Sequence, residues 1–194
     1  MIYNFVNLVS WRFFIEIKST NQRTIFVDSL SLLFCCRLFG VKVEKKSGIN
    51  FFHNNINTDD SIFLIASNNN SFNHKMILPF WKSIDEISIS EINTQKLYDY
   101  NNIVIGISSP KQDHLAQLIN NQFPEKNIFC LGAAIYTSSQ SLQSDKISLN
   151  WLFMMFRDFK RFKNKMYSTL KELYLINFTS KSKEKFKLFL KLLN

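Results

Sequence analysis

Asp28 is the carboxylate of this sequence best placed to do chemistry, because of the segments on either side of it. It comes directly after the apolar run Thr24–Val27 and before an apolar helical pattern over Ser29–Phe39. A carboxylate at the end of a buried strand can serve as a general base. An aspartate at the start of a helix more often accepts hydrogen bonds from the first backbone N–H groups. The spacing alone favours this capping role and leaves the base role as the alternative.

A second candidate is the segment Ser108–Asp113, which follows another apolar run. Ser109 and Gln112 have the spacing of a capping box, and Pro110 suits the first position of a helix. The free N–H groups at that helix start, with Lys111 beside them, would also bind an anion such as a phosphate. The two roles are compatible, so the segment is predicted both to begin a helix and to form an anion site.

A third strand end carries Ser67 and Asn68. Residues of these types form either a plain turn or a loop that contacts a nucleotide. Sheets of parallel strands bind their ligands at the carboxyl ends of the strands. The ends of these three runs are therefore where we expect the chemistry of this protein.

Cysteine and histidine spacing does not predict a metal site. The three histidines have no spacing from cysteine or aspartate that suits zinc. Cys35 and Cys36 are adjacent in the chain and Cys130 stands alone, which is a poor basis for disulfides. We predict reduced thiols in the core of a cytosolic protein, with no metal and no other cofactor.

The elements that would position these residues alternate between strands and helices. Six runs of β-branched and aromatic residues, apolar on both faces, predict buried parallel strands at Ile2–Val6, Thr24–Val27, Ile62–Ala66, Ile87–Ile89, Asn102–Ile107 and Asn127–Leu131. Helical patterns occupy Leu8–Lys18, Ser29–Phe39, Ile49–Asn55, Phe72–Lys82 and Pro110–Asn121. This alternation predicts a Rossmann-like α/β fold, with a mostly parallel sheet flanked by helices and a basic helical C-terminal appendage.

The positive charge of the chain is concentrated near its C-terminus. The 194 residues carry a formal net charge of +9 and are 46% hydrophobic, which suits one folded domain and excludes a disordered chain. Residues 1–150 contain 13 Lys and Arg against 12 Asp and Glu, a net charge of +1. Residues 151–194 contain 11 against 3, a net charge of +8. Such asymmetry predicts an anionic surface or polymer as a partner.

Two basic helices are predicted in this C-terminal quarter. The first has an apolar stripe that we expect to pack on the body of the protein, formed by Trp151, Met155, Phe159, Phe162, Met166, Leu170 and Leu173. The second has so many lysines around Phe186, Phe189, Leu190 and Leu193 that an anionic membrane surface explains it better than core packing. A nucleic acid is the less favoured partner, because the chain has no recognised reading motif and no second basic patch.

Several segments, taken in order from about Asn4 to Lys165, resemble the WecG/TagA/CpsF family of glycosyltransferases. The most specific is Gly106-Ile107-Ser108-Ser109-Pro110-Lys111-Gln112-Asp113, which resembles the family's Gly-x-x-Ser-Pro-Lys-Gln-Glu. The others are Val27-Asp28-Ser29, Arg37-Leu38-Phe39-Gly40, Lys46-Ser47-Gly48-Ile49-Asn50-Phe51, Cys130-Leu131-Gly132-Ala133-Ala134 and Leu149-Asn150-Trp151-Leu152-Phe153.

This resemblance implies an inverting, metal-independent glycosyltransferase of cell-envelope polysaccharide synthesis. It would move a sugar, of the N-acetylmannosamine type or a related hexose, from a UDP-sugar to a polyprenyl-diphosphate-linked acceptor. Asp28 would be the catalytic base. The donor would contact Asn7, Lys45, Ser47, Gly48, Ser67, Asn68, Ser109, Lys111 and Gln112. The acceptor diphosphate or the membrane would contact Arg157, Lys160, Arg161 and Lys163.

The resemblance also implies a catalytic domain at 1–148 and an amphipathic appendage at 149–194. The appendage would hold the protein peripherally at the inner face of the cytoplasmic membrane. The absence of any Asp-x-Asp sequence agrees with transfer that needs no metal. Four positions that are charged or glycine in the family are Ser29, Asn50, Asn150 and Met154 here. A catalytically weakened or inactive relative that binds a nucleotide-sugar or a partner protein is therefore the alternative.

Overall fold

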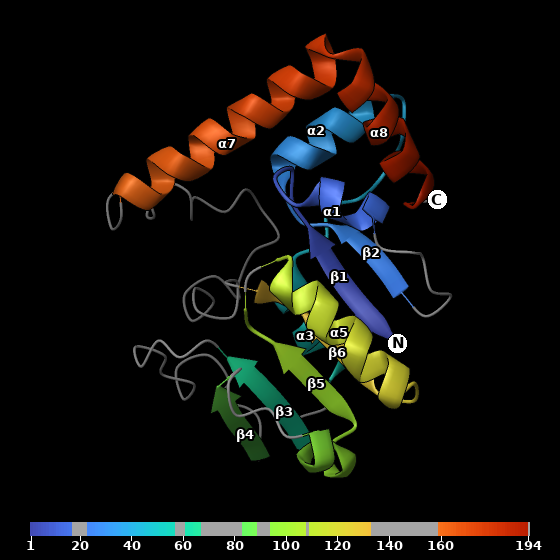
Figure 1. The fold of residues 1–194 in the computed structure, drawn as a ribbon, viewed down its shortest axis with the longest axis vertical. Helices are drawn as coiled ribbons and strands as arrows, with labels where there is room; N and C mark the ends of the chain where they lie inside the picture. Colours follow the sequence, from blue (N-terminus) through green and yellow to red (C-terminus); the bar gives the residue numbers. More distant parts are fainter. Residues whose placement is uncertain are drawn as a thin grey trace. The chain divides into compact units, whose positions relative to one another are not determined.

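Six strands form one sheet, in the order β2-β1-β6-β5-β3-β4. The computed structural model describes residues 1–16, 23–56, 61–66, 83–88, 94–107, 109–132 and 159–193 (Figure 1). The strands are β1 (Ile2–Val6), β2 (Arg23–Val27), β3 (Ser61–Ala66), β4 (Ser83–Ser88), β5 (Asn102–Ile105) and β6 (Asn127–Cys130). The pairs β1–β6, β6–β5, β5–β3 and β3–β4 are all parallel, which confirms the predicted α/β fold.

Most of the described helices fall between the strands, as the alternating pattern predicts, and the last two follow β6. They are α1 (Trp11–Glu16), α2 (Leu30–Leu38), α3 (Gly48–Asn55), the short 3₁₀ helix η2 (Thr94–Asp99), α5 (Lys111–Gln122), α7 (Phe159–Phe178) and α8 (Ser180–Lys191). The predicted helix Phe72–Lys82 and the N-terminal part of the predicted C-terminal helix lie outside the described residues.

Two predicted boundaries differ from the structure for clear reasons. The helix expected from Leu8 begins only at Trp11, because the Asn7 side chain accepts hydrogen bonds from the Val9 and Ser10 N–H groups and closes a turn first. The short strand expected at Ile87–Ile89 is β4, which begins earlier and includes two acidic residues. Among the described strands β4 lies at the edge of the sheet, and charged residues are common in edge strands.

The described residues divide into two compact units, each with its own core. The first contains residues 1–5, 23–24, 46–56, 61–66, 83–88, 94–107 and 109–132, and the second contains residues 6–16, 25–45 and 159–193. The described part of the segment expected as a separate appendage, residues 159–193, is thus grouped with segments from the N-terminal quarter of the chain.

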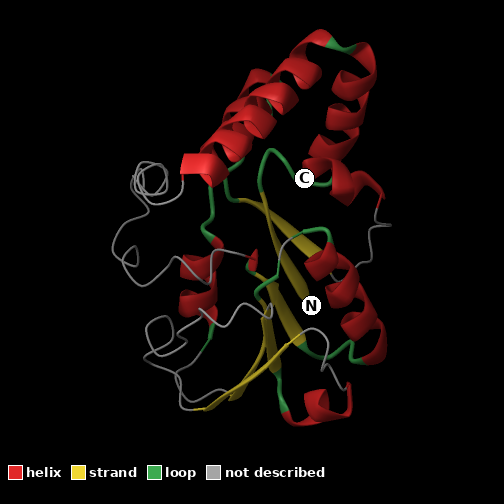
Figure 2. Ribbon diagram, turned by 60° about the vertical axis from the view of Figure 1, so that its left-hand side comes forward, coloured by secondary structure: helices red, strands yellow, loops and turns green. Residues whose placement is uncertain are grey.

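In the first unit, helices cover both faces of the strands (Figure 2). One face carries Phe63, Ile65, Ile103 and Ile105, which pack with Ala116 and Ile119 of α5. The opposite face carries Ile62, Leu64, Val104 and Phe129, which pack with Phe52 of α3 and with Ile56. Successive side chains of a strand point to opposite faces, so each run that is apolar on both faces is buried on both faces.

In the second unit, α8 belongs to the core. Its Phe186 and Phe189 are fully buried, and the Phe186 ring lies edge-on to that of Trp11, with 5.0 Å between centroids. Phe186 also packs against Phe39, at 5.2 Å between centroids. Leu190 is buried in the same cluster. The expectation that this helix presents its apolar side chains to a membrane is therefore wrong: other aromatic side chains cover them.

The apolar stripe that was expected to pack α7 on the body of the protein is only partly buried. Phe159, Met166 and Leu170, predicted to pack on the body, are exposed, whereas Leu173 of the same stripe packs with the buried Ile176 in the core of the second unit. Glu172 fixes the orientation of the helix, because its carboxylate accepts hydrogen bonds from Trp11 Nε1 and Arg12 Nε at 3.1 and 2.9 Å. Helical spacing identified the stripe but could not tell which face of the helix would turn inward.

The three cysteines are free and buried, as predicted. Burial raises the pKa of Cys35 and of Cys36 to about 11, so both thiols are protonated at neutral pH. Within the part of the chain that the structure describes, no helix is long and apolar enough to cross a membrane.

Candidate functional site

The start of α5 brings together three of the predicted site residues, Ser109, Lys111 and Gln112. Its N-terminus follows β5, and Gly132 follows β6, the neighbouring strand. Gln112 is only 6% exposed and lies against Gly132, whose backbone has the positive φ of 56° that favours glycine. A Cβ at position 132 would lie 3.4 Å from Gln112 Oε1. Gln112 and Gly132 thus form one corner at the carboxyl ends of two adjacent strands.

The amide oxygen of Gln112 has no hydrogen-bond partner among the described residues, although it is buried. Leaving such an acceptor unsatisfied costs about 1–3 kcal/mol. Unsatisfied buried groups are uncommon in folded proteins and concentrate where a ligand completes them. Asn4 Oδ1 and two nitrogens of Arg23 in this unit are also buried without a partner among the described residues. Of these groups, Gln112 is the one that lies beside Gly132 after the strand ends, so we take it as the candidate ligand-binding side chain.

Asp113, the next residue along, is a fully buried carboxylate that the sequence analysis did not select. Its Oδ1 accepts a hydrogen bond from Asn4 Nδ2 at 2.6 Å, and its Oδ2 accepts one from Ser109 Oγ at 2.5 Å. Asp113 thus ties β1 and the turn before α5 to the helix. An acidic residue in the first turn of a helix was the signal that could have identified it.

The predicted capping box does not form, because the Ser109 hydroxyl bonds to the Asp113 carboxylate. The helix begins at Lys111, and its N-cap residue, Pro110, makes no side-chain capping bond. The Ser109 hydroxyl donates to the Asp113 carboxylate, and Gln112 packs against Gly132. Backbone N–H groups at the start of α5 are therefore not occupied by the side chains that the sequence pattern assigned to them.

Burial raises the pKa of the Asp113 carboxyl above its ordinary value of 3.8. The hydrogen bond from Ser109 and the positive charges of Arg23 and His114 oppose the rise. Arg23 is held over α5 by a 3.0 Å hydrogen bond from its Nη2 to Gln117 Oε1. The buried Cys130 thiol lies near this group, and burial followed by the charge of Asp113 raises its pKa too.

The stability of the protein is expected to fall as the pH rises through the raised pKa of Asp113. Between 3.8, the value for the unfolded chain, and the higher folded value, only the folded state holds the proton. The linked stabilisation is therefore complete below the unfolded pKa and is lost as the pH passes the folded pKa. The asparagine of an Asp113→Asn protein cannot ionise, so this part of the pH dependence should disappear. The free energy of unfolding, measured with urea from acidic to neutral pH, gives the test.

Asp99→Asn is the matched control, because Asp99 is exposed at the end of η2 and the substitution is the same. It should leave the pH dependence of stability as in the native protein. Equal pH dependence in the Asp113→Asn and native proteins would contradict the linkage.

The predicted residues around α3 have structural roles. Gly48 begins the helix, and a Cβ there would lie 2.9 Å from Phe5 Cγ and 3.2 Å from Leu131 Cδ2, so its lack of a side chain permits close packing. Ser47 is the N-cap residue, but its side chain makes no capping hydrogen bond. Lys45, in the second unit, pairs through its backbone with Val27.

Asp28 and Asn7 both lie in the second unit. Asp28 is half-buried after β2, and its backbone N–H donates to Val6 O at 2.9 Å. The capping role favoured for Asp28 belongs instead to Ser29, whose Oγ accepts a hydrogen bond from the Leu32 N–H. The side-chain oxygen of Asn7 accepts the two hydrogen bonds that close the turn after β1. Of the two polar atoms of this side chain, the oxygen is thus used by the turn.

Of the remaining predicted residues, some are exposed on helices and others lie outside the described residues. Lys111 is exposed on the first turn of α5, and Lys160 and Lys163 are exposed on α7. Arg161 lies in α7, but its side chain is not described. Ser67, Asn68 and Arg157 lie outside the described residues.

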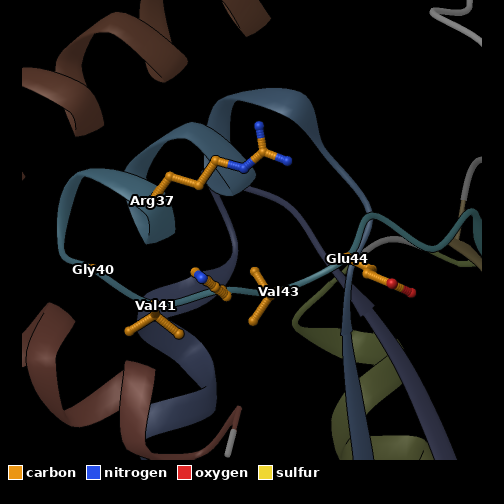
Figure 3. A pocket seen from close by; sticks show the side chains of 6 residues that line it. Arg37, Gly40, Val41, Val43 and Glu44 are labelled. Atoms are coloured by element: carbon orange, nitrogen blue, oxygen red, sulfur yellow. The ribbon is translucent and has the colours of Figure 1, made fainter.

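A hollow of about 620 Å³ lies in the second unit, where the chain leaves α2 (Figure 3). Arg37 in the last turn of α2 lines it, together with the extended segment that follows, Gly40, Val41, Lys42, Val43 and Glu44. None of the residues predicted to touch a substrate lines this hollow. Elsewhere, the described residues contain no cluster of three or more His, Cys, Asp or Glu that could hold a metal ion.

At the level of class, the fold and the corner at α5 define an α/β protein with a parallel sheet and polar groups at its strand ends. Comparisons with protein-family models, curated proteins and solved structures found no match to this chain.

Proposed function

We propose that this protein is a glycosyltransferase that binds a UDP-sugar at the start of α5 and transfers the sugar to a polyprenyl-diphosphate-linked acceptor. The observation that carries the proposal is the buried Gln112 amide beside Gly132, whose oxygen has no partner in the described structure. A sugar hydroxyl or a uracil N–H would donate to that oxygen and remove the cost of its burial.

The start of α5 also supports binding of the donor diphosphate. The first N–H groups of a helix have no intrahelical acceptor and form, with the helix dipole, a favourable site for an anion. α5 has 12 residues, and its N-cap residue, Pro110, makes no side-chain capping bond. Lys111 is exposed on the first turn and adds a positive charge. The same corner thus offers groups for both ends of a nucleotide-sugar.

The proposed reaction requires one base and a stabilised leaving group. Asp28 takes the proton from the acceptor hydroxyl as that oxygen forms its bond to the anomeric carbon. The bond from this carbon to the β-phosphate oxygen breaks, and UDP leaves with the electron pair. Attack opposite the leaving group inverts the anomeric centre. Positive groups and N–H donors of the protein stabilise the negative charge that develops on the departing diphosphate.

Donor binding should depend on Gln112. A panel of UDP-sugars, with UDP alone, is expected to raise the melting temperature of the native protein, because a ligand that binds only the folded state stabilises it. Gln112→Ala should abolish the shift. Gln122→Ala, the same substitution at an exposed position in the last turn of α5, should keep it. If neither UDP nor any UDP-sugar shifts the native protein, the proposal fails.

The second candidate is a catalytically weakened relative that retains donor binding. Ser29 favours it, because this residue replaces the glycine expected after the catalytic aspartate and its hydroxyl now caps α2. Such a protein would show the Gln112-dependent melting shift without sugar transfer. Turnover with a UDP-sugar and a lipid-linked acceptor distinguishes the two candidates.

A further inference from the structure

We infer that Asn4 is a positioning residue of the proposed donor site, because its hydrogen bond to Asp113 fixes the start of α5. The inference rests on the proposed function and adds to it a residue that acts through another side chain. Asn4 is the middle residue of β1, and it is fully buried. Its Nδ2 donates to Asp113 Oδ1 at 2.6 Å, although the two residues are 109 positions apart in the chain.

Stability alone does not explain an asparagine at position 4. Along β1 it alternates with Ile2 and Val6, which are both fully buried, so an apolar side chain would suit this position. The Asn4 Oδ1 atom has no hydrogen-bond partner among the described residues, which is a further cost. A buried polar pair often stabilises a protein no more than well-packed apolar side chains do. What such a pair adds is one required arrangement of the elements that it joins.

The element that this pair fixes is the turn before α5. Asp113 Oδ2 accepts a hydrogen bond from Ser109 Oγ, so one carboxylate is held both from β1 and from the turn. The Asp113 N–H donates to Pro110 O, whereas the earlier N–H groups of α5, those of Lys111 and Gln112, have no acceptor within the helix. These are the N–H groups that the helix offers to a diphosphate.

The same arrangement directs the Gln112 side chain. Gln112 and Asp113 are neighbours on the first turn of α5, so a turn held through Asp113 also keeps the Gln112 amide against Gly132. Binding groups that are ordered before the ligand arrives bind it more tightly, because the ligand does not have to supply the cost of ordering them. Without Asn4, the carboxylate would keep its bond to Ser109 and lose its bond to the sheet.

Asn4→Leu should weaken the binding of UDP, measured by isothermal titration calorimetry, by roughly tenfold, the factor that one good hydrogen bond is worth. Amide hydrogen exchange in the first two turns of α5 should become faster, because the turn is no longer held to β1. Asn4→Asp should have the same effects, since it brings two carboxylates together in the core. Asn4→Asp combined with Asp113→Asn exchanges the two groups and should restore both UDP affinity and slow exchange.

Ile119→Val is the control for a loss of stability alone, because Ile119 is buried on α5 and the substitution removes a single methylene group from the core. It should lower the melting temperature and leave UDP affinity unchanged. Equal UDP affinity and equal exchange in the Asn4→Leu and native proteins would overturn the inference and leave the proposed function standing. So would a loss of affinity in Ile119→Val as large as that in Asn4→Leu.

A native protein that does not bind UDP would instead defeat the proposed function. Amide exchange would still decide whether Asn4 holds the start of α5. Faster exchange confined to this helix start in Asn4→Leu, with recovery in the exchanged pair, would support that role. Unchanged exchange would overturn it.

Discussion

Phe186→Ala is expected to lower the free energy of unfolding by about 3–5 kcal/mol, the usual loss when a fully buried aromatic side chain is removed from a core. Phe186 is 0% exposed and contacts the rings of Trp11, Phe39 and Phe189 at centroid distances of 5.0, 5.2 and 5.9 Å. Trp11 and Phe39 come from segments far from α8 in the chain, so the cavity would weaken the attachment of α8. Urea unfolding measures the loss.

Leu188→Ala on the same helix is the control for this prediction. Its side chain is half exposed, and surface substitutions usually change stability by less than about 0.5 kcal/mol. A large loss for Phe186→Ala with little change for Leu188→Ala would confirm that the apolar face of α8 is core. A Phe186→Ala protein as stable as the native one would show that α8 is not held by this cluster.

Asp28→Asn is expected to lower the rate of sugar transfer by about 10²–10⁴-fold, the usual contribution of a general base. An amide has nearly the same shape as a carboxylate but cannot accept the acceptor's proton at neutral pH. Asp28 is half-buried, and its backbone N–H donates to Val6 O, a bond that the substitution keeps. The rate should therefore fall while the melting shift caused by a UDP-sugar remains. Purified protein with a lipid-linked acceptor gives the measurement.

Asp99→Asn, on the exposed end of η2, should transfer sugar at the native rate. An unchanged rate for Asp28→Asn would exclude Asp28 as the base. Loss of the UDP-sugar melting shift in Asp28→Asn would instead show that Asp28 binds the donor, so the rate alone would not assign its role.

The alternation of strands and helices was predictable because each part of it is a local property of the chain. Runs such as Ile62–Ala66 and Asn102–Ile107 contain more apolar side chains than one face of a strand can bury. In the structure both runs have side chains on each face of the sheet, one set packed with α5 and the other with α3. The sequence pattern thus predicted parallel strands between two layers of helices.

The candidate site was only partly predictable. Gln112 was selected from the segment after β5, and it is the buried amide of the corner with Gly132. Asp113 was not selected, because sequence spacing assigned Ser109 to the backbone rather than to a carboxylate four residues later. The partner that decides its role, Asn4, lies 109 residues away along the chain. No local pattern relates the two positions.

The sequence by itself determined the fold class, the strands, the free thiols and the concentration of positive charge in the last quarter of the chain. Only the tertiary structure decided which apolar faces are buried. Helical spacing marks a stripe on α7 and another on α8 with equal clarity, but burial depends on what packs against each stripe. Trp11 and Phe39 cover the phenylalanines of α8, whereas the bonds of Glu172 to Trp11 and Arg12 direct the side of α7 that carries Glu172, Leu173 and Ile176 toward the core. The side chains that remain exposed on α7 follow from these long-range contacts.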